Sequence, residues 1–132
     1  MTRRLVADAS AIVALLTDSG PVGQWATEMM SDADLYAPAV MPFECTDIFR
    51  RHELAGVISA DQAAQAHTDL VDMPVDLWPY ETVATRVWDL RANLSSYDAA
   101  YVAVAEVTNA SLLTLDGRIA KAPRIRCSVK TP

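Results

Sequence analysis

The sequence predicts an α/β fold in which helices cover both faces of a central, mostly parallel sheet of about five short strands. The first reason is that short apolar runs alternate along the chain with longer segments of helical pattern, the order that parallel strands and crossover helices require. The second reason is that residues 99–107 form a helical segment that is apolar on nearly every side, as expected for a helix inside a layered domain.

Five segments have the character of strands: residues 4–7, 35–37, 74–78, 111–115 and 125–129. The first four are short apolar runs, and each is followed directly by an aspartate or a proline. The fifth alternates between apolar and polar side chains, so we expect it at an edge of the sheet.

Helical segments separate most of these strands, at residues 11–16, 21–30, 41–55, 60–71, 80–93 and 99–107. Pro21 and Pro42 fit the first turn of the second and third helices, and Gly56 is expected to end the third. Ser59 is the expected N-cap of the fourth helix. Strands separated by helices in this way imply a three-layer α/β/α arrangement.

The length of 132 residues suits one domain, which we expect to span residues 1–132. No apolar run reaches the ~18 residues of a membrane span, and the N-terminal stretch lacks the apolar region of a signal peptide. A soluble, cytoplasmic protein without a membrane partner is therefore expected. Cys45 and Cys127 have no metal or redox spacing, so we interpret them as free thiols of a reducing compartment.

The net charge of −6 argues against general electrostatic binding to nucleic acid. The charge is uneven, however, because residues 117–132 hold five basic side chains and no acidic one. This segment is either a local basic rim or a solvated basic tail, and the sequence leaves both possibilities open.

Four acidic residues border strongly apolar segments: Asp8, Glu44, Asp98 and Asp116. Asp8 follows the first predicted strand and Asp116 follows the fourth. The carboxyl ends of parallel strands are where ligands bind in such sheets, which puts both residues at the expected functional edge. Asp98 begins the apolar helix, and Glu44 lies at the border of an apolar helical face.

Each of these acids also has a purely structural explanation. Asp8 could cap a helix, Asp98 could complete a capping box with Ser95, Asp116 could belong to a turn, and Glu44 could favour a helix dipole. Together, however, converging carboxylates repel one another and stay ionised only around a cation. Oxygen ligands suit Mg²⁺ or Mn²⁺, which supports nuclease or phosphatase chemistry.

Other chemistries have less support. The four glycines are scattered and form no phosphate-binding loop, and His52 and His67 lie on polar helical stretches. Trp25, Trp78 and Trp88 are interpreted as core or interface residues rather than as a surface for base stacking.

Four segments carry a resemblance to a known family: VADAS at 6–10, PFE at 42–44, YDAAYVAVAE at 97–106 and LLTLDGRIA at 112–120. In this order they resemble the PIN-domain family. More closely, the chain is similar to the VapC toxins of bacterial VapBC toxin–antitoxin pairs. The similarity covers almost the whole chain and implies a PIN-like α/β/α fold.

The resemblance implies an endoribonuclease that holds Mg²⁺ or Mn²⁺ and uses activated water to cut RNA. The four acids that match the family pattern are Asp8, Glu44, Asp98 and Asp116, the first and third being the principal metal ligands. Ser10 and Thr114 match hydroxyl residues that support the first and fourth acids. A homodimer and an inhibitory VapB-like antitoxin are also implied. Two alternatives stay open: a PIN-type module that binds RNA or protein with little catalysis, and a nuclease directed at DNA.

Overall fold

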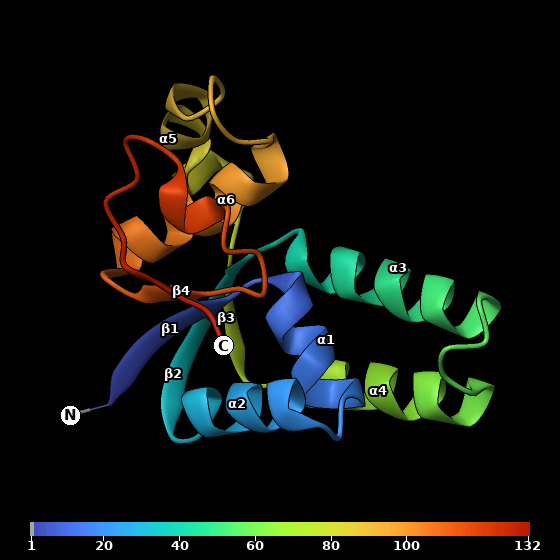
Figure 1. Cartoon of the computed structure of the whole chain (residues 1–132). Coiled ribbons are helices and arrows are strands. Elements are labelled where there is room, and N and C mark those ends of the chain that lie inside the picture. Colours follow the sequence, from blue (N-terminus) through green and yellow to red (C-terminus); the bar gives the residue numbers. More distant parts are fainter. Residues whose placement is uncertain (1) are drawn as a thin grey trace.

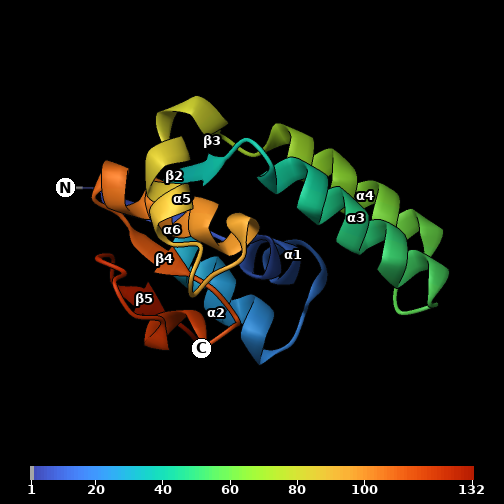
Figure 2. The ribbon, with the colours of Figure 1, turned by 90° about the horizontal axis from the view of Figure 1, so that it is seen from above.

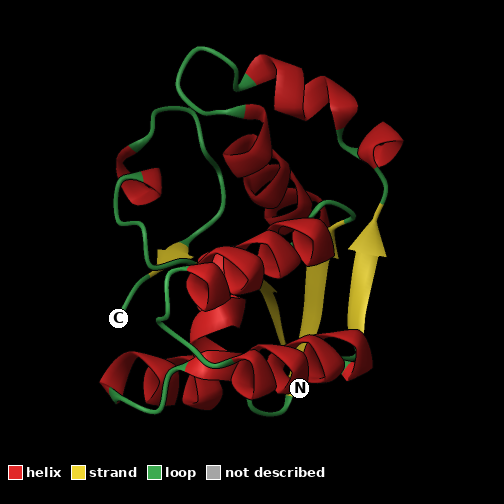
Figure 3. Ribbon diagram, turned by 90° about the vertical axis from the view of Figure 1, so that its right-hand side faces the viewer, coloured by secondary structure: helices red, strands yellow, loops and turns green. Residues whose placement is uncertain are grey.

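The computed structural model describes residues 2–132 and contains one five-stranded sheet (Figure 1). Its strands are β1 (Arg3–Ala7), β2 (Ala33–Pro38), β3 (Val75–Trp78), β4 (Ser111–Leu113) and β5 (Val129–Lys130). The order across the sheet is β3-β2-β1-β4-β5, and every neighbouring pair is parallel. Figure 3 shows the arrows of the longer strands pointing the same way.

Six α-helices connect the strands: α1 (Ala9–Thr17), α2 (Pro21–Met30), α3 (Met41–Leu54), α4 (Ala60–Asp72), α5 (Ala84–Asp89) and α6 (Ser96–Thr108). The first two crossovers run from β1 to β2 and from β2 to β3, whereas the third returns across the sheet to β4. Right-handed crossovers therefore put α1–α4 on one face and α5 and α6 on the other. This arrangement confirms the expected three-layer fold.

The helical layers differ in how they meet the sheet. Helix α6 packs across β2, β1 and β4, and α5 packs against α6. On the opposite face α1 and α2 contact the sheet, while α3 and α4 form a pair that packs on α1 and extends away from the strands (Figure 2). The core lies between these layers, and α6 is buried on most sides, as its composition predicts.

The order of the strands places the candidate site. The connection that follows β1 leads to one side of the sheet, toward β2, and the connection that follows β4 leads to the other side, toward β5. The point between β1 and β4 is therefore a topological switch point, where the carboxyl ends of parallel strands leave a crevice. Asp8 and Asp116 follow these two strands.

Two predicted elements were placed incorrectly. Residues 80–93 do not form one helix: a short 3₁₀ turn η1 (Tyr80–Thr82) precedes α5, and Val83 between them has φ −126° and ψ 3°, outside the helical range. The last strand begins at Val129 instead of residue 125, because residues 117–128 run as loop around a second 3₁₀ turn, η2 (Ile119–Lys121).

Several expected boundaries are confirmed. Helix α2 spans the predicted residues, and Ser59 caps α4 in a full capping box with Gln62. Strand β4, however, ends at Leu113, two residues before the predicted end. Both Cys45 and Cys127 are free thiols. Across residues 2–132, no helix combines the length and apolar character needed to cross a bilayer.

One carboxylate anchors the C-terminal loop. Glu106, near the end of α6, accepts hydrogen bonds from Nε and Nη2 of Arg86 at 2.7 and 3.1 Å and from the backbone N–H of Arg126 at 2.7 Å. Arg86 also donates to the carbonyl oxygen of Arg124 at 2.6 Å. Residues 117–128 lack a long regular element, so this Glu106 anchor fixes their path against α5 and α6.

Candidate active site

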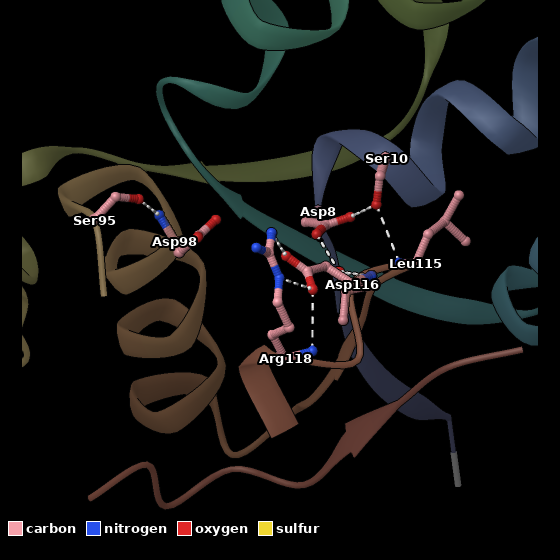
Figure 4. Close-up of polar contacts among 8 residues, drawn as sticks. Asp8, Ser10, Ser95, Asp98, Leu115, Asp116 and Arg118 are labelled. Carbon is pink, nitrogen blue, oxygen red and sulfur yellow. Dashed lines mark hydrogen bonds and ion pairs between the residues drawn. The ribbon is translucent and has the colours of Figure 1, made fainter. Parts of the chain in front are cut away.

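Asp8 is the most firmly held of the four predicted acids. It caps α1, is 8% exposed, and accepts a hydrogen bond from the backbone N–H of Ala11 at 3.1 Å. Two hydroxyl groups also donate to its carboxylate, Ser10 to Oδ1 and Thr114 to Oδ2, each at 2.5 Å (Figure 4). The donors come from the residue after β4 as well as from α1, so the carboxylate is fixed from both sides of the switch point.

The same two hydroxyl groups shape the loop that follows β4. Ser10 Oγ accepts from the backbone N–H of Leu115 at 3.1 Å, and Thr114 Oγ1 accepts from the backbone N–H of Asp116 at 2.9 Å. Each hydroxyl therefore donates to Asp8 and accepts from the loop that carries Asp116. Ser10 and Thr114 thus connect Asp8 to the loop after β4, and their supporting role in catalysis stays a prediction.

Asp116 is exposed by comparison and is paired with a neighbouring cation. Arg118 donates to it from Nε at 2.9 Å, from Nη2 at 2.8 Å and from its backbone N–H at 3.0 Å. These contacts lower the pKa of the Asp116 carboxyl below its usual range. The Arg118 side chain is 91% exposed, and in the view of Figure 4 its guanidinium lies between Asp98 and Asp116.

Asp98 lies in the first turn of α6, where Ser95 is the N-cap. The Ser95 hydroxyl accepts from the backbone N–H of Asp98 at 3.1 Å, which is one half of the capping box considered above. Burial raises the pKa of the Asp98 carboxyl, and the negative charges of Asp8 and Asp116 raise it further. Asp98 is thus close enough to Asp8 and Asp116 for their charges to affect its ionisation.

Glu44 lies in the first turn of α3 and is bound by a residue of α6. The hydroxyl of Tyr101 donates to Glu44 Oε1 at 2.5 Å. Burial raises the pKa of Glu44, the Tyr101 hydrogen bond opposes this, and the charges of Asp98 and Asp8 raise it again. Glu44 therefore belongs to the same electrostatic neighbourhood as the other acids, and burial beside Glu44 raises the pKa of Tyr101.

The donor chemistry of this neighbourhood fits a divalent cation, whereas its present geometry is not closed around one. Four carboxylates from four separate segments offer only oxygen ligands, the type that Mg²⁺ and Mn²⁺ prefer. Within residues 2–132, however, no three Asp, Glu, His or Cys side chains stand close enough to hold one ion in this conformation. Arg118 engages both carboxylate oxygens of Asp116, so Asp116 would have to exchange partners to bind a cation, whereas Tyr101 donates to Oε1 of Glu44 alone.

A polar cleft of about 320 Å³ opens beside these acids. The residues that line it include Ser95, Asp98, Asp116, Arg118 and Lys121. We call this the acidic cleft. It brings two of the predicted acids together with two residues of the basic segment 117–132, which supports a local basic rim over a free tail.

Sequence reasoning missed two functional contacts. The apolar pattern of residues 99–107 predicts Tyr101 only as a buried side chain, although Tyr101 lies three residues after Asp98 and so shares a helical face with it. Arg118 was counted only as part of the basic segment. Its position two residues after Asp116 was the available signal for a local ion pair.

Comparison with known proteins identifies the class of this fold and site. The model of the PIN domain matches residues 5–125, so the chain belongs to the PIN-domain family, as the sequence motifs suggested.

Particular relatives narrow the class. The chain is 32% identical over 126 residues to ribonuclease VapC1 of Mycobacterium tuberculosis and 31% identical over 125 residues to a VapC ribonuclease of Mycobacterium bovis, with 95% of each chain covered in both cases. Its fold is similar to that of VapBC2 from Rickettsia felis, solved with a DNA fragment from their promoter, with a TM-score of 0.69 at 10% identity. That match covers 97% of this chain and 98% of the other. The resemblance to VapC toxins is thereby confirmed.

Proposed function

We propose that this chain is a metal-dependent endoribonuclease of the VapC type, acting through residues 1–132 as one domain. The relatives named as ribonucleases confirm the expected class of enzyme, a nuclease. The observation that carries the proposal is that the charge of Asp8 raises the pKa values of Glu44 and Asp98, while the Thr114 hydroxyl joins Asp8 to the backbone of Asp116 at the carboxyl ends of β1 and β4. Carboxylates arranged in this way favour a cation between them.

Mg²⁺ or Mn²⁺ is the proposed cofactor, with Asp8 and Asp98 as principal ligands. Glu44 and Asp116 complete the set, directly or through water. A bound divalent ion supplies polarisation of a phosphoryl oxygen and a water of lowered pKa, the chemistry that phosphodiester hydrolysis needs.

Neighbouring side chains orient the carboxylates that would bind the metal, and the environment of these carboxylates sets their protonation. The Ser10 and Thr114 hydroxyl groups hold the Asp8 carboxylate in one orientation, and Tyr101 does the same for Glu44. Because burial raises the pKa values of Asp98 and Glu44, protons compete with the cation for these two carboxylates. Metal affinity should therefore increase with pH.

RNA is the proposed substrate, attracted locally and not by the protein as a whole. The net charge of −6 repels a polyanion, whereas Arg118 and Lys121 at the edge of the acidic cleft offer cations to phosphate groups. Single-stranded loops are the expected targets because their backbone and bases are accessible.

A VapB-like antitoxin and a second copy of the chain are the proposed protein partners. The VapC names of the curated relatives and the VapBC2 neighbour support the antitoxin. Its inhibitory segment would cover the acidic cleft, where a basic side chain of the antitoxin would replace the positive charge of the metal. The homodimer is proposed from the resemblance to the family.

The direct test is cleavage of RNA by the purified chain with Mg²⁺ or Mn²⁺, compared with EDTA and with a DNA oligonucleotide of the same sequence. Asp8→Asn and Asp98→Asn should each lower the rate by more than about 100-fold, because loss of residues that merely support metal ligands already costs about 10–100-fold. Asp72→Asn, an exposed change at the end of α4, is the matched control. Retained cleavage in either site variant would contradict the proposal, and preferred cleavage of DNA would redirect it.

One observation favours the alternative of a binding module with little catalysis, namely that no three carboxylates within residues 2–132 yet surround a common point. A thermal-shift titration with Mn²⁺ separates the two functions. A true metal site stabilises the native state by an amount that grows with the logarithm of the ion concentration above the dissociation constant, and the shift should disappear in Asp98→Asn. Absence of any shift in the wild-type protein would favour the binding module.

A further inference from the structure

An apolar pocket of about 230 Å³ lies next to the acidic cleft and is not used by the proposed chemistry. Its walls include three aromatic side chains and three valines: Trp78, Tyr80, Tyr97, Val40, Val83 and Val87. We call it the aromatic pocket. None of its lining residues carries a charge.

The aromatic pocket and the acidic cleft share one wall, the first turn of α6. Ser96 and Tyr97 line the pocket, whereas Ser95 and Asp98 line the cleft. The pocket also contains Trp78, at the carboxyl end of β3. It therefore lies along the same edge of the sheet as the acids, and two strand spacings of about 4.8 Å separate β3 from β1.

The aromatic rings at the mouth of the pocket are poorly covered by the fold. Tyr80 is 64% exposed and Tyr97 is 59% exposed. The indole N–H of Trp78 is buried and has no acceptor among residues 2–132. Clustered exposed aromatic surface is typical of a binding site, and a buried donor without a partner is a feature that a ligand's acceptor could satisfy.

The chemistry of the residues that line the two depressions matches the two ends of a nucleotide. The acidic cleft offers Arg118 and Lys121 for phosphate, whereas the aromatic pocket offers aromatic and aliphatic side chains and no cation. Aromatic stacking binds unpaired bases with about 1–3 kcal/mol per base, and sequence-specific RNA recognition uses bases that are turned out of single-stranded loops.

We propose that the aromatic pocket binds one nucleobase of a single-stranded RNA whose neighbouring phosphate lies in the acidic cleft. This inference rests on the proposed ribonuclease function and adds the part of the substrate that determines where the strand is held. Trp78 packs against the core, as the sequence predicts, and in this proposal it also lines the site for the base.

The test measures binding without catalysis, so that it does not depend on the metal. Fluorescence anisotropy in EDTA would follow a labelled, unstructured RNA as it binds the full chain. Tyr80→Ala and Tyr97→Ala should each weaken binding by about 5- to 150-fold, the equivalent of one lost stacking contact. Tyr80→Phe and Tyr97→Phe keep the ring and should bind nearly as the wild-type chain does. Trp88→Ala removes an aromatic side chain of similar exposure, 65%, outside the pocket and should have no effect.

A second arm identifies the ligand as a base. An RNA with one abasic position at the site of contact should bind the wild-type chain more weakly, and Tyr97→Ala should show no further loss with it. Unchanged RNA binding in both alanine variants would overturn the proposal. So would a loss of self-association with intact RNA binding, measured by sedimentation, because the pocket would then contact a second copy of the chain. If the alanine variants lose RNA binding while the wild-type chain cleaves nothing with Mg²⁺ or Mn²⁺, the pocket stands and the nuclease proposal fails.

Discussion

The two sides of the β1–β4 switch point hold their acids in opposite ways. On the β1 side, Asp8 is buried and accepts from two hydroxyl groups and a backbone N–H. On the β4 side, Asp116 is bound by an arginine whose side chain is 91% exposed. Buried hydrogen bonds to a charged group are firm, whereas exposed ion pairs contribute little and exchange readily. The Asp8 half of the site is therefore preorganised, and the Asp116 half is free to change partners.

The largest change in stability and metal affinity should come from removing a hydrogen bond to Asp8, in the preorganised half of the site. Thr114→Val removes a buried hydroxyl that donates to Asp8 and accepts from the Asp116 backbone. The free energy of unfolding should fall by about 1–3 kcal/mol, because the buried Asp8 carboxylate and the partly buried backbone N–H of Asp116 each lose a partner. Mn²⁺ affinity should fall by about 10–100-fold. Urea unfolding and calorimetric titration measure these two quantities.

Thr114→Ser is the matched control for this change. It keeps the hydroxyl and removes only a methyl group, so metal affinity should stay close to that of the wild-type chain. Equal losses of metal affinity in Val and Ser variants would show that packing, and not the hydrogen bonds, holds Asp8.

A smaller change in metal affinity, of opposite sign, is expected from the Asp116–Arg118 pair. Arg118→Ala frees the Asp116 carboxylate, so Mn²⁺ should bind the metal-free protein more tightly, by less than about tenfold because the pair is exposed. Arg118→Lys keeps the charge but loses the two-point contact and should give an intermediate value. Calorimetry at low salt measures the change. Weaker Mn²⁺ binding in Arg118→Ala would mean that the arginine assists the cation and does not compete with it.

The smallest effect concerns pH in the absence of metal. The folded-state pKa of Asp98 is raised above its usual 3.8, by burial first and then by neighbouring charges. The native protein thus keeps this proton at pH values where the unfolded chain has released it, and Asp98 lowers the free energy of unfolding as the pH rises through that window.

Asp98→Asn cannot ionise, so its stability relative to the wild-type chain should increase from about pH 4 to about pH 7. Urea unfolding in EDTA at several pH values measures the difference. A difference in stability that stays constant with pH would contradict the raised pKa of Asp98.

Much of the fold follows from local pattern. The alternation of strands and helices predicts the layers, and the parallel sheet then places Asp8 and Asp116 at one edge. Residues 80–93 were misjudged because helical propensity does not reveal that Val83 leaves the helical conformation. Residues 125–129 were misjudged because the Arg126 N–H is bound by the Glu106 carboxylate, a contact made across 20 residues.

The candidate site was predictable in its residue types but not in their partners. The sequence provides four acids and two supporting hydroxyl residues, and the structure shows how the hydroxyl groups connect two of them. The Glu44–Tyr101 contact joins residues 57 positions apart on different helices, so no local pattern could reveal it. Arg118 was visible as a charge, but its choice of Asp116 over a phosphate or solvent depends on the loop's conformation.

Helix α6 carries Asp98 in its first turn and the Glu106 anchor near its other end, about 12 Å further along the axis. Both sides of the acidic cleft therefore depend on α6. One side is the first turn of this helix, and the other side is the loop after β4, which Glu106 near the end of α6 holds in place. A substitution that tilts α6 would move both sides of the cleft together. A substitution at Glu106, far from the acidic cleft, should therefore change the geometry of that cleft.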